Sequence, residues 1–279
     1  MNPLPRCLLA LAGCVPLPAA AEDLPLWELG AGLGVLSFNE YRGSSQRSNH
    51  VLPVPYFVYR GEVFKADRDG IRGQLFDGEH LRLNVSLGAS VPVDSHDSGR
   101  RRGMPDLKAT VEVGPALEIR LWTSADRKQR LELRLPARLA LTVEGPPRDI
   151  GVVFSPNLNL DIDDPLGFRD WHLGLLAGPI YADARNHGYF YDVAPRYANA
   201  ERPVYHAGAG YSGSRFLVAV SKRFPQFCVG GFARYDDLRG AVFEDSPLVD
   251  SRSSWAAGAA IAWVFDQSAT RVPADDWRP

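Results

Sequence analysis

Apolar and polar residues alternate with a period of two over most of this chain. In residues 129–145, QRLELRLPARLALTVEG, every odd position from Leu131 to Val143 is apolar. The charged residues all lie on even positions: Arg130, Glu132, Arg134, Arg138 and Glu144. Successive side chains of a β-strand point to opposite faces, so this alternation predicts a strand with one apolar and one charged face.

The pattern recurs along the sequence. Further alternating segments are 27–38, 80–91, 107–122, 151–162 and 254–265. Turn-forming pairs such as Arg60-Gly61 and Asp77-Gly78 separate the apolar runs, and no segment of similar length keeps a helical period. Counting the runs predicts about twelve strands. Less regular stretches at 39–50, 94–106, 183–203 and 237–253 are predicted to be loops.

The length of the strands indicates which kind of β protein this is. The alternating segments reach 12 to 16 residues, whereas strands of soluble proteins average about 5–6 residues and a strand that crosses a bilayer needs about 9–11. A sheet in lipid must pair every backbone group within itself, so it closes. We therefore expect an all-β fold, an antiparallel transmembrane β-barrel of the outer-membrane type. The odd residues of 129–145 would face lipid, and Arg130 to Glu144 would face a polar lumen.

Aromatic residues and overall composition agree with this expectation. Trp255 and Trp263 share the parity of the apolar face, as residues of an aromatic girdle would. The formal net charge of −2 argues against a nucleic-acid partner, which needs a basic excess. After the amino terminus no apolar stretch is long enough for a helical span. The mean hydropathy of −0.18 is compatible with a barrel, whose apolar signal is hidden by alternation.

The amino terminus has the features of an export signal. Arg6 precedes an apolar run over 7–15, and Ala19 to Ala21 offer a cleavage site. We therefore predict a signal peptide over 1–21, a barrel over 22–265 and a polar carboxy-terminal tail over 266–279. Cys14, in the sequence LAGC, leaves lipid attachment open as an alternative. Cleavage at Ala21 would leave Cys228 as the mature chain's one cysteine, without an internal disulfide.

Candidate catalytic and metal-binding residues are scattered. The six histidines lack the spacing of zinc ligands, so we predict no catalytic residue, no cofactor site and no metal site. A lipid-processing enzyme of the serine–histidine type would need a hydroxyl within reach of a base. His206 and Ser212 lie six residues apart, about 20 Å along one strand, which excludes that pair. A partner from another strand stays open.

Three loop segments each allow two interpretations. Asp161, Asp163 and Asp164 form either a solvated turn or, with less support, a calcium site. The run Arg100 to Arg102 is either a solvated loop or a docking site for anionic groups, and its replacement should leave folding intact. The segment 236–252 mixes apolar and acidic residues and would form either a partner surface or a plug in the lumen.

Several segments resemble the MipA/OmpV family of outer-membrane proteins of Gram-negative bacteria. The resemblance is carried by YFYDV at 189–193, by RYDDLRGAVFEDSPLV at 234–249, with Asp245, Ser246 and Pro247, and by VLPVPYFVYRGEVFKADRDGI at 51–71. It covers most of the chain after the signal segment, in order. One departure is the polar tail that follows Phe265, because barrels of this compartment commonly end on an aromatic residue.

The resemblance implies a small outer-membrane barrel without catalytic residues. The leading hypothesis is a scaffold for the murein machinery, with a membrane-bound lytic transglycosylase and a bifunctional penicillin-binding protein as partners besides outer-membrane lipid. The alternatives are a narrow porin-like channel or surface adhesin and, third, a lipid-modifying barrel enzyme. Which loops face outwards and whether the lumen conducts are left open.

Overall fold

Long antiparallel strands make up most of the fold. The computed structural model describes residues 24–60, 64–67, 70–73, 76–77, 81–96 and 99–272. The long strands are β2 (Trp27–Asn39), β3 (Arg47–Arg60), β7 (Leu81–Ser90), β8 (Thr110–Thr123), β9 (Gln129–Thr142), β12 (Trp171–Ala182), β13 (Gly210–Arg223), β14 (Phe227–Asp237) and β15 (Ser253–Gln267). Between β9 and β12, the shorter β10 (Asp149–Phe154) and β11 (Asn157–Asp163) follow each other as one interrupted wall strand.

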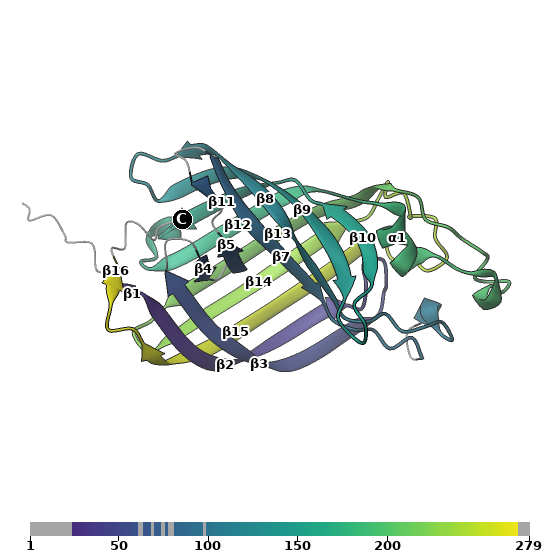
Figure 1. Ribbon diagram of the computed structural model, residues 1–279, viewed down its shortest axis with the longest axis horizontal. Helices are drawn as coiled ribbons and strands as arrows, with labels where there is room; N and C mark the ends of the chain where they lie inside the picture. Colours follow the sequence, from purple (N-terminus) through teal and green to yellow (C-terminus); the bar gives the residue numbers. More distant parts are fainter. Residues whose placement is uncertain are drawn as a thin grey trace, which may run out of the picture.

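These strands form one antiparallel sheet that curves into a barrel (Figure 1). Neighbours in sequence are neighbours in the sheet, except that β15 pairs with β2 and joins the two ends of the chain. The short strands β4 (Phe64–Asp67), β5 (Gly70–Gly73) and β6 (Phe76–Asp77) lie between β3 and β7, and β5 contacts β7. The predicted all-β barrel is therefore confirmed. The expected number of about twelve strands stays a prediction, since residues 61–80 are described only in part.

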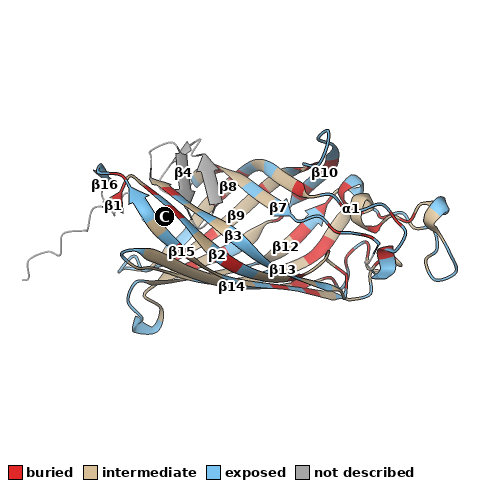
Figure 2. Ribbon diagram, turned by 90° about the horizontal axis from the view of Figure 1, so that it is seen from below, coloured by how far each residue is buried: buried red, intermediate tan, exposed pale blue. Residues whose placement is uncertain are grey.

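The two faces of the barrel wall differ as the alternation predicts. In β9, Arg130, Glu132 and Ala140 are buried on the inner face, while the odd residues from Leu131 to Leu141 are partly or fully exposed. Exposed apolar side chains continue around the outer surface (Figure 2): Leu33, Val35, Val51, Phe57, Leu87, Val152, Leu158, Val218, Trp255 and Trp263. An outer surface of this composition suits hydrocarbon, and an inner face of charged side chains suits a polar lumen.

Two residues depart from the predicted pattern. Glu144, expected in the lumen, is exposed in the loop after β9, because that strand ends at Thr142. Leu107, expected on the lipid face, is buried outside the wall, because β8 begins only at Thr110. The alternation of apolar and polar residues in the sequence continues past the ends of both strands. It therefore does not mark the residue at which the backbone leaves the sheet.

The two ends of the barrel are built differently. At one end the strands are joined by short turns, 124–128, 164–170 and 224–226, and β1 (Leu24–Pro25) pairs there with β16 (Arg271–Val272). The predicted signal segment 1–21 and the last residues of the tail, 273–279, lie outside the described residues. At the other end three connections are long, 91–109, 183–209 and 238–252, and the shorter connection 40–46 lies with them. The helix α1 (Ala184–Tyr191) lies there, and no described helix has the length and apolar character of a membrane span.

The long connections pack together as a small folded body, which we call the cap. Its core contains Tyr41, Leu107, Tyr191, Leu238 and Phe243, all buried. The rings of Tyr191 and Phe243 stack with centroids 3.7 Å apart. The hydroxyl of Tyr41 donates to the carbonyl of Leu248 at 2.7 Å, and that of Tyr191 donates to the carbonyl of Arg42 at 2.8 Å. Four connections far apart in sequence thus share one core.

Two of the segments that carry the family resemblance, 189–193 and 234–249, meet in this cap, whereas 51–60 belongs to strand β3 of the wall. Ser246 Oγ donates to the carbonyl of Tyr191 at 2.8 Å. Val193 and Leu248 are fully buried in a second apolar cluster with Met104. Three apolar side chains of 236–252, Leu238, Phe243 and Leu248, are therefore buried in the cap, whereas Val242 is 38% exposed. Both interpretations of that segment stay predictions.

Gly151 allows α1 to approach the wall. It has φ +110°, and a Cβ there would lie 2.1 Å from Asp183 Oδ1 and 2.7 Å from the Asn186 nitrogen. Asp183 is the N-cap of α1 and accepts from Asn186 N at 2.8 Å. Any side chain at position 151 would push the helix away from β10. The glycine therefore sets how closely the cap sits on the barrel.

Candidate functional site

Charged side chains fill the inner face of the barrel towards the short-turn end. Glu132, only 2% exposed, accepts hydrogen bonds from Arg82 and from Arg134, the latter at 3.0 Å. Arg82 also lies 3.7 Å from Glu118, and Arg134 lies 3.5 Å from Asp161. Buried charges are stable only when paired, so these residues form one connected network across β7, β8, β9 and β11. The lumen here is occupied by the protein's own side chains.

Nearer the cap, Arg138 holds three strands together. Its Nε donates to Glu112 at 2.9 Å, and its other nitrogens donate to Ser86 at 3.1 Å and to Ser155 at 3.0 Å. Above this arginine lies a cavity of about 450 Å³, bounded by the upper wall and by residues of the cap. A volume in this range is typical of small-molecule sites.

A cluster of arginines around one carboxylate borders this cavity. Asp236 is fully buried, and Arg215 Nε donates to it at 2.8 Å. The Nε atoms of Arg42 and Arg234 lie 3.5 and 3.4 Å from the same carboxylate. Arg42 also donates to the carbonyl of Ser212 at 2.6 Å, which ties the cap to β13. Three guanidinium groups thus share a single negative partner.

A buried histidine and serine lie side by side at the junction of α1 and β13. His187 Nδ1 contacts the carbonyl of Gly208 at 2.7 Å, and since a carbonyl only accepts, Nδ1 carries the proton. Nε2 then accepts from Ser212 Oγ. Burial lowers the pKa of His187, which favours this neutral form. His206, which the sequence excluded as the partner of Ser212, does not contact it; the partner is His187 of α1, which the folded connection brings to the wall.

Gly213 makes room beside this pair. It has φ +102°, and a Cβ there would lie 2.3 Å from the Asp237 carbonyl and 3.0 Å from an Arg42 nitrogen. In this pair the hydroxyl of Ser212 donates to Nε2 of His187, which is also the arrangement of a nucleophilic serine and its general base. Both side chains are nonetheless at most 2% exposed. The contact links the cap to the barrel wall at the edge of the cavity.

The structure separates the three arginines of 100–102. Arg101 is 3% exposed and donates to the carbonyls of Phe190 and Pro105 at 2.9 and 3.1 Å. Arg100 and Arg102 are exposed. The burial of Arg101 contradicts its interpretation as part of a solvated loop. Its replacement would remove the donor that Arg101 supplies to the carbonyl of Phe190, so we now expect a loss of stability at this position.

The three aspartates at 161–164 do not converge. Asp161 lies 3.5 Å from Arg134, Asp163 lies 3.6 Å from Arg130, and Asp164 accepts from Lys128 Nζ at 2.6 Å. Each carboxylate serves a different cationic side chain. This arrangement supports ion pairs within the protein and does not support a shared calcium ion.

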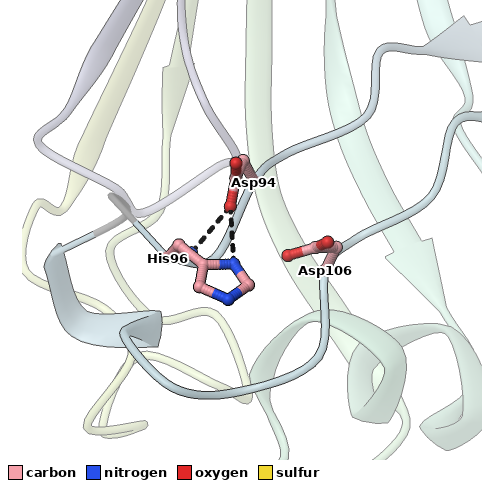
Figure 3. Close-up of side chains that lie close together, drawn as sticks. All are labelled: Asp94, His96 and Asp106. Carbon is pink, nitrogen blue, oxygen red and sulfur yellow. Dashed lines mark hydrogen bonds and ion pairs between the residues drawn. The ribbon is translucent and has the colours of Figure 1, made fainter.

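A small group of possible metal ligands, which the sequence did not predict, lies on the cap. Asp94, His96 and Asp106 place one ligand atom each within 4.8 Å of the others, and all three are exposed (Figure 3). Asp94 Oδ1 accepts from the nitrogen of His96 at 2.8 Å, and Asp106 accepts from that of Ser95 at 2.8 Å. Because these loop hydrogen bonds explain the arrangement, we assign no metal to it.

The architecture defines the class of protein. An antiparallel barrel with an apolar outer face, a charged lumen and one long-loop end is an outer-membrane β-barrel protein. The chain is 26% identical over 215 residues to outer membrane protein OmpV of Vibrio cholerae serotype O1, covering 75% of this chain and 76% of that protein. Outer membrane protein Omp26La of Vibrio anguillarum is similar to the same extent.

The family follows from a match to most of the chain. The family described as MltA-interacting protein MipA matches residues 31–265, and the chain belongs to this family. Among solved structures, it is similar to the NanC porin, at 8% identity and a TM-score of 0.38, with 84% of this chain and 98% of that chain covered. It is also similar to a bacterial polysaccharide outer membrane secretin, at 8% identity and a TM-score of 0.43, with 86% and 99% covered.

Proposed function

We propose that this outer-membrane barrel is a non-enzymatic scaffold for the murein synthesis and remodelling machinery, with a membrane-bound lytic transglycosylase and a bifunctional penicillin-binding protein as partners. The observation that supports this proposal is that side chains fill the lumen. Glu132, Arg130 and Asp161 are buried in ion pairs that occupy the barrel, and the cap covers its other end. A filled barrel supports a function exercised at its rims. The description of the family as MltA-interacting supports the class of partner.

The partners would meet the short-turn end. Short turns of outer-membrane barrels lie in the periplasm and long loops outside, and murein lies in the periplasm. The turn 164–170 presents Leu166, 97% exposed, and Phe168, 62% exposed. Leu166 also has φ +54°, a conformation that leucine rarely adopts. Leu166 is not buried within the chain, and its backbone conformation does not favour leucine. An apolar side chain at this position is therefore better explained by a contact with another protein.

We expect the double variant Leu166→Asp/Phe168→Asp to lose partner binding. The turn itself is held by Asp164, which accepts from Lys128 at 2.6 Å and from the Asp170 nitrogen at 2.7 Å, so the substitutions should leave the barrel intact. Co-purification of a lytic transglycosylase with the full chain from native outer membrane should fall at least about tenfold, as removal of a central apolar contact predicts.

A matched control is Val204→Asp. Val204 is 48% exposed on the opposite end, in the connection 183–209, so this variant should retain the partner. Undiminished co-purification with the double variant would contradict docking at this turn. Steady single-channel conductance of the purified wild type would contradict the filled lumen and favour the porin-like alternative. Binding to host surfaces lost only in Val204→Asp would favour the adhesin.

One observation favours a second function, hydrolysis of a lipid acyl ester. Ser212 Oγ would attack the ester carbonyl while His187 Nε2 takes its proton and returns it to the leaving alcohol; water would then release the acid. Because Ser212 is 1% exposed, we rank this function below the scaffold.

Labelling of the full chain by an alkyl fluorophosphonate separates the two functions. We expect no labelling at Ser212, and we expect Ser212→Ala to lower the stability of the cap by about 1–3 kcal/mol because His187 Nε2 loses its donor. Labelling that disappears in Ser212→Ala would instead establish the hydrolase.

A further inference from the structure

The cavity between the barrel wall and the cap has a charge imbalance that the proposed scaffold function does not use. Arg42, Arg215 and Arg234 surround Asp236, which leaves two positive charges in excess. The Nε atoms of Arg42 and Arg234 are buried without a hydrogen bond. Like charges held together away from water repel one another strongly, so an additional anion would stabilise this cluster.

The neighbouring ion pair does not change the sign of this excess. Arg138 is paired with Glu112 at 2.9 Å and adds no net charge. Glu40, on the loop that enters the cap, also borders the cavity. The positive charge beside the cavity comes from Arg42, Arg215 and Arg234, and it favours an anionic ligand.

The rest of the lining mixes polar side chains, among them Asn39, Thr110 and Ser254, with aliphatic and aromatic ones. Phe38 lies at the end of β2, Phe232 lies on β14 and Phe243 enters from the cap. A purely inorganic anion would leave these rings facing an empty or hydrated space, whereas an apolar body would be buried against them. Charge and lining together describe a ligand with one charged end.

We propose that this cavity binds a small amphipathic carboxylate. Its carboxylate is held by the guanidinium groups of Arg215 and Arg234, with Arg42 beside them, and its aromatic or short aliphatic body lies against Phe38 and Phe232. Guanidinium groups suit this role because their planar donors match both oxygens of a carboxylate. The site is independent of the proposed scaffold function, since the turn 164–170 lies at the other end of the barrel.

Calorimetric titration of the full chain in detergent with benzoate tests the proposal. Benzyl alcohol has the ring without the charge, and acetate has the charge without the ring. We expect benzoate to bind at least about tenfold more tightly than either, because each lacks one half of the recognition. Equal affinity for benzoate and benzyl alcohol, equal affinity for benzoate and acetate, or no binding of benzoate would each overturn the proposal.

Two arginine variants locate the site. Arg234→Gln should weaken benzoate at least about tenfold, whereas Arg223→Gln should leave its affinity unchanged, because Arg223 pairs with Glu28 at the short-turn end. Unchanged affinity in Arg234→Gln would overturn the assignment. If that variant does not fold, the thermal unfolding of the wild type tests the site. Benzoate should raise the midpoint temperature of unfolding, and benzyl alcohol should not. Equal shifts with the two compounds would contradict the site.

Discussion

Glu132→Gln is expected to destabilise the barrel by about 3 kcal/mol, because it removes one charge from a buried ionic network and leaves the other charges in place. Glu132 is 2% exposed and accepts from both Arg82 and Arg134. The substitution keeps the shape of the side chain, so cavity formation makes no contribution. Urea unfolding in detergent, followed by the change in electrophoretic mobility of the folded barrel, measures the difference.

The control for this variant is Glu201→Gln. Glu201 is exposed on the cap, and its replacement should change the free energy of unfolding by no more than about 0.5 kcal/mol. A Glu132→Gln barrel as stable as the wild type would mean that water solvates Arg82 and Arg134 in the lumen. That result would also weaken the scaffold proposal, which depends on a lumen filled by side chains.

Val220→Arg is expected to cost about 2–4 kcal/mol, the penalty for a lipid-facing arginine near the bilayer midplane. Val220 is 40% exposed on the outer face of β13. It lies opposite Gly231, which in turn lies opposite Ala259, midway between Trp255 and Trp263 on β15. If these tryptophans mark the two interfaces, position 220 lies at the greatest depth. The same unfolding measurement, with Val220→Met as the apolar control, gives the value.

Leu121→Arg tests whether the penalty depends on depth. Leu121 is 49% exposed near the end of β8, beside Trp122, where an arginine side chain can reach the interface. We expect about 0–1 kcal/mol there. Equal penalties at positions 121 and 220 would show that the outer face does not span a hydrocarbon layer in the orientation described. A negligible penalty at both positions would show that neither side chain faces hydrocarbon.

The comparison of sequence with structure is clearest in β9. Alternation alone predicted that Arg130 and Glu132 share one face and Leu131 and Leu133 the other, and the burial of these residues agrees. It could not predict where the strand ends, so Glu144 was placed in the lumen although it is exposed in a loop. Parity is a local property of the chain, whereas the end of a strand depends on its neighbour, since β9 stops where its pairing with β8 and β10 stops.

The candidate site shows the same limit. Ser212 was recognised as a hydroxyl that would need a base from elsewhere, but His187 could not be identified as that base, because the two residues lie 25 positions apart in the sequence. Arg101 was read as part of an exposed run although it is buried among carbonyls from 190 and 105. The residues that flank His187 and Arg101 in the sequence do not reveal these contacts. The contacts form only when the long connections pack against one another.

The sequence by itself determined that this protein is a membrane barrel, which residues face lipid in the strands that alternate, and roughly where the irregular connections lie, because a period of two assigns each residue of an alternating strand to a side. Only the tertiary structure decided which charges pair in the lumen, that the connections fold into a cap, and that three arginines gather around Asp236. Those outcomes depend on the register at which distant strands close and on packing between loops, and neither is encoded in the periodicity of any one segment.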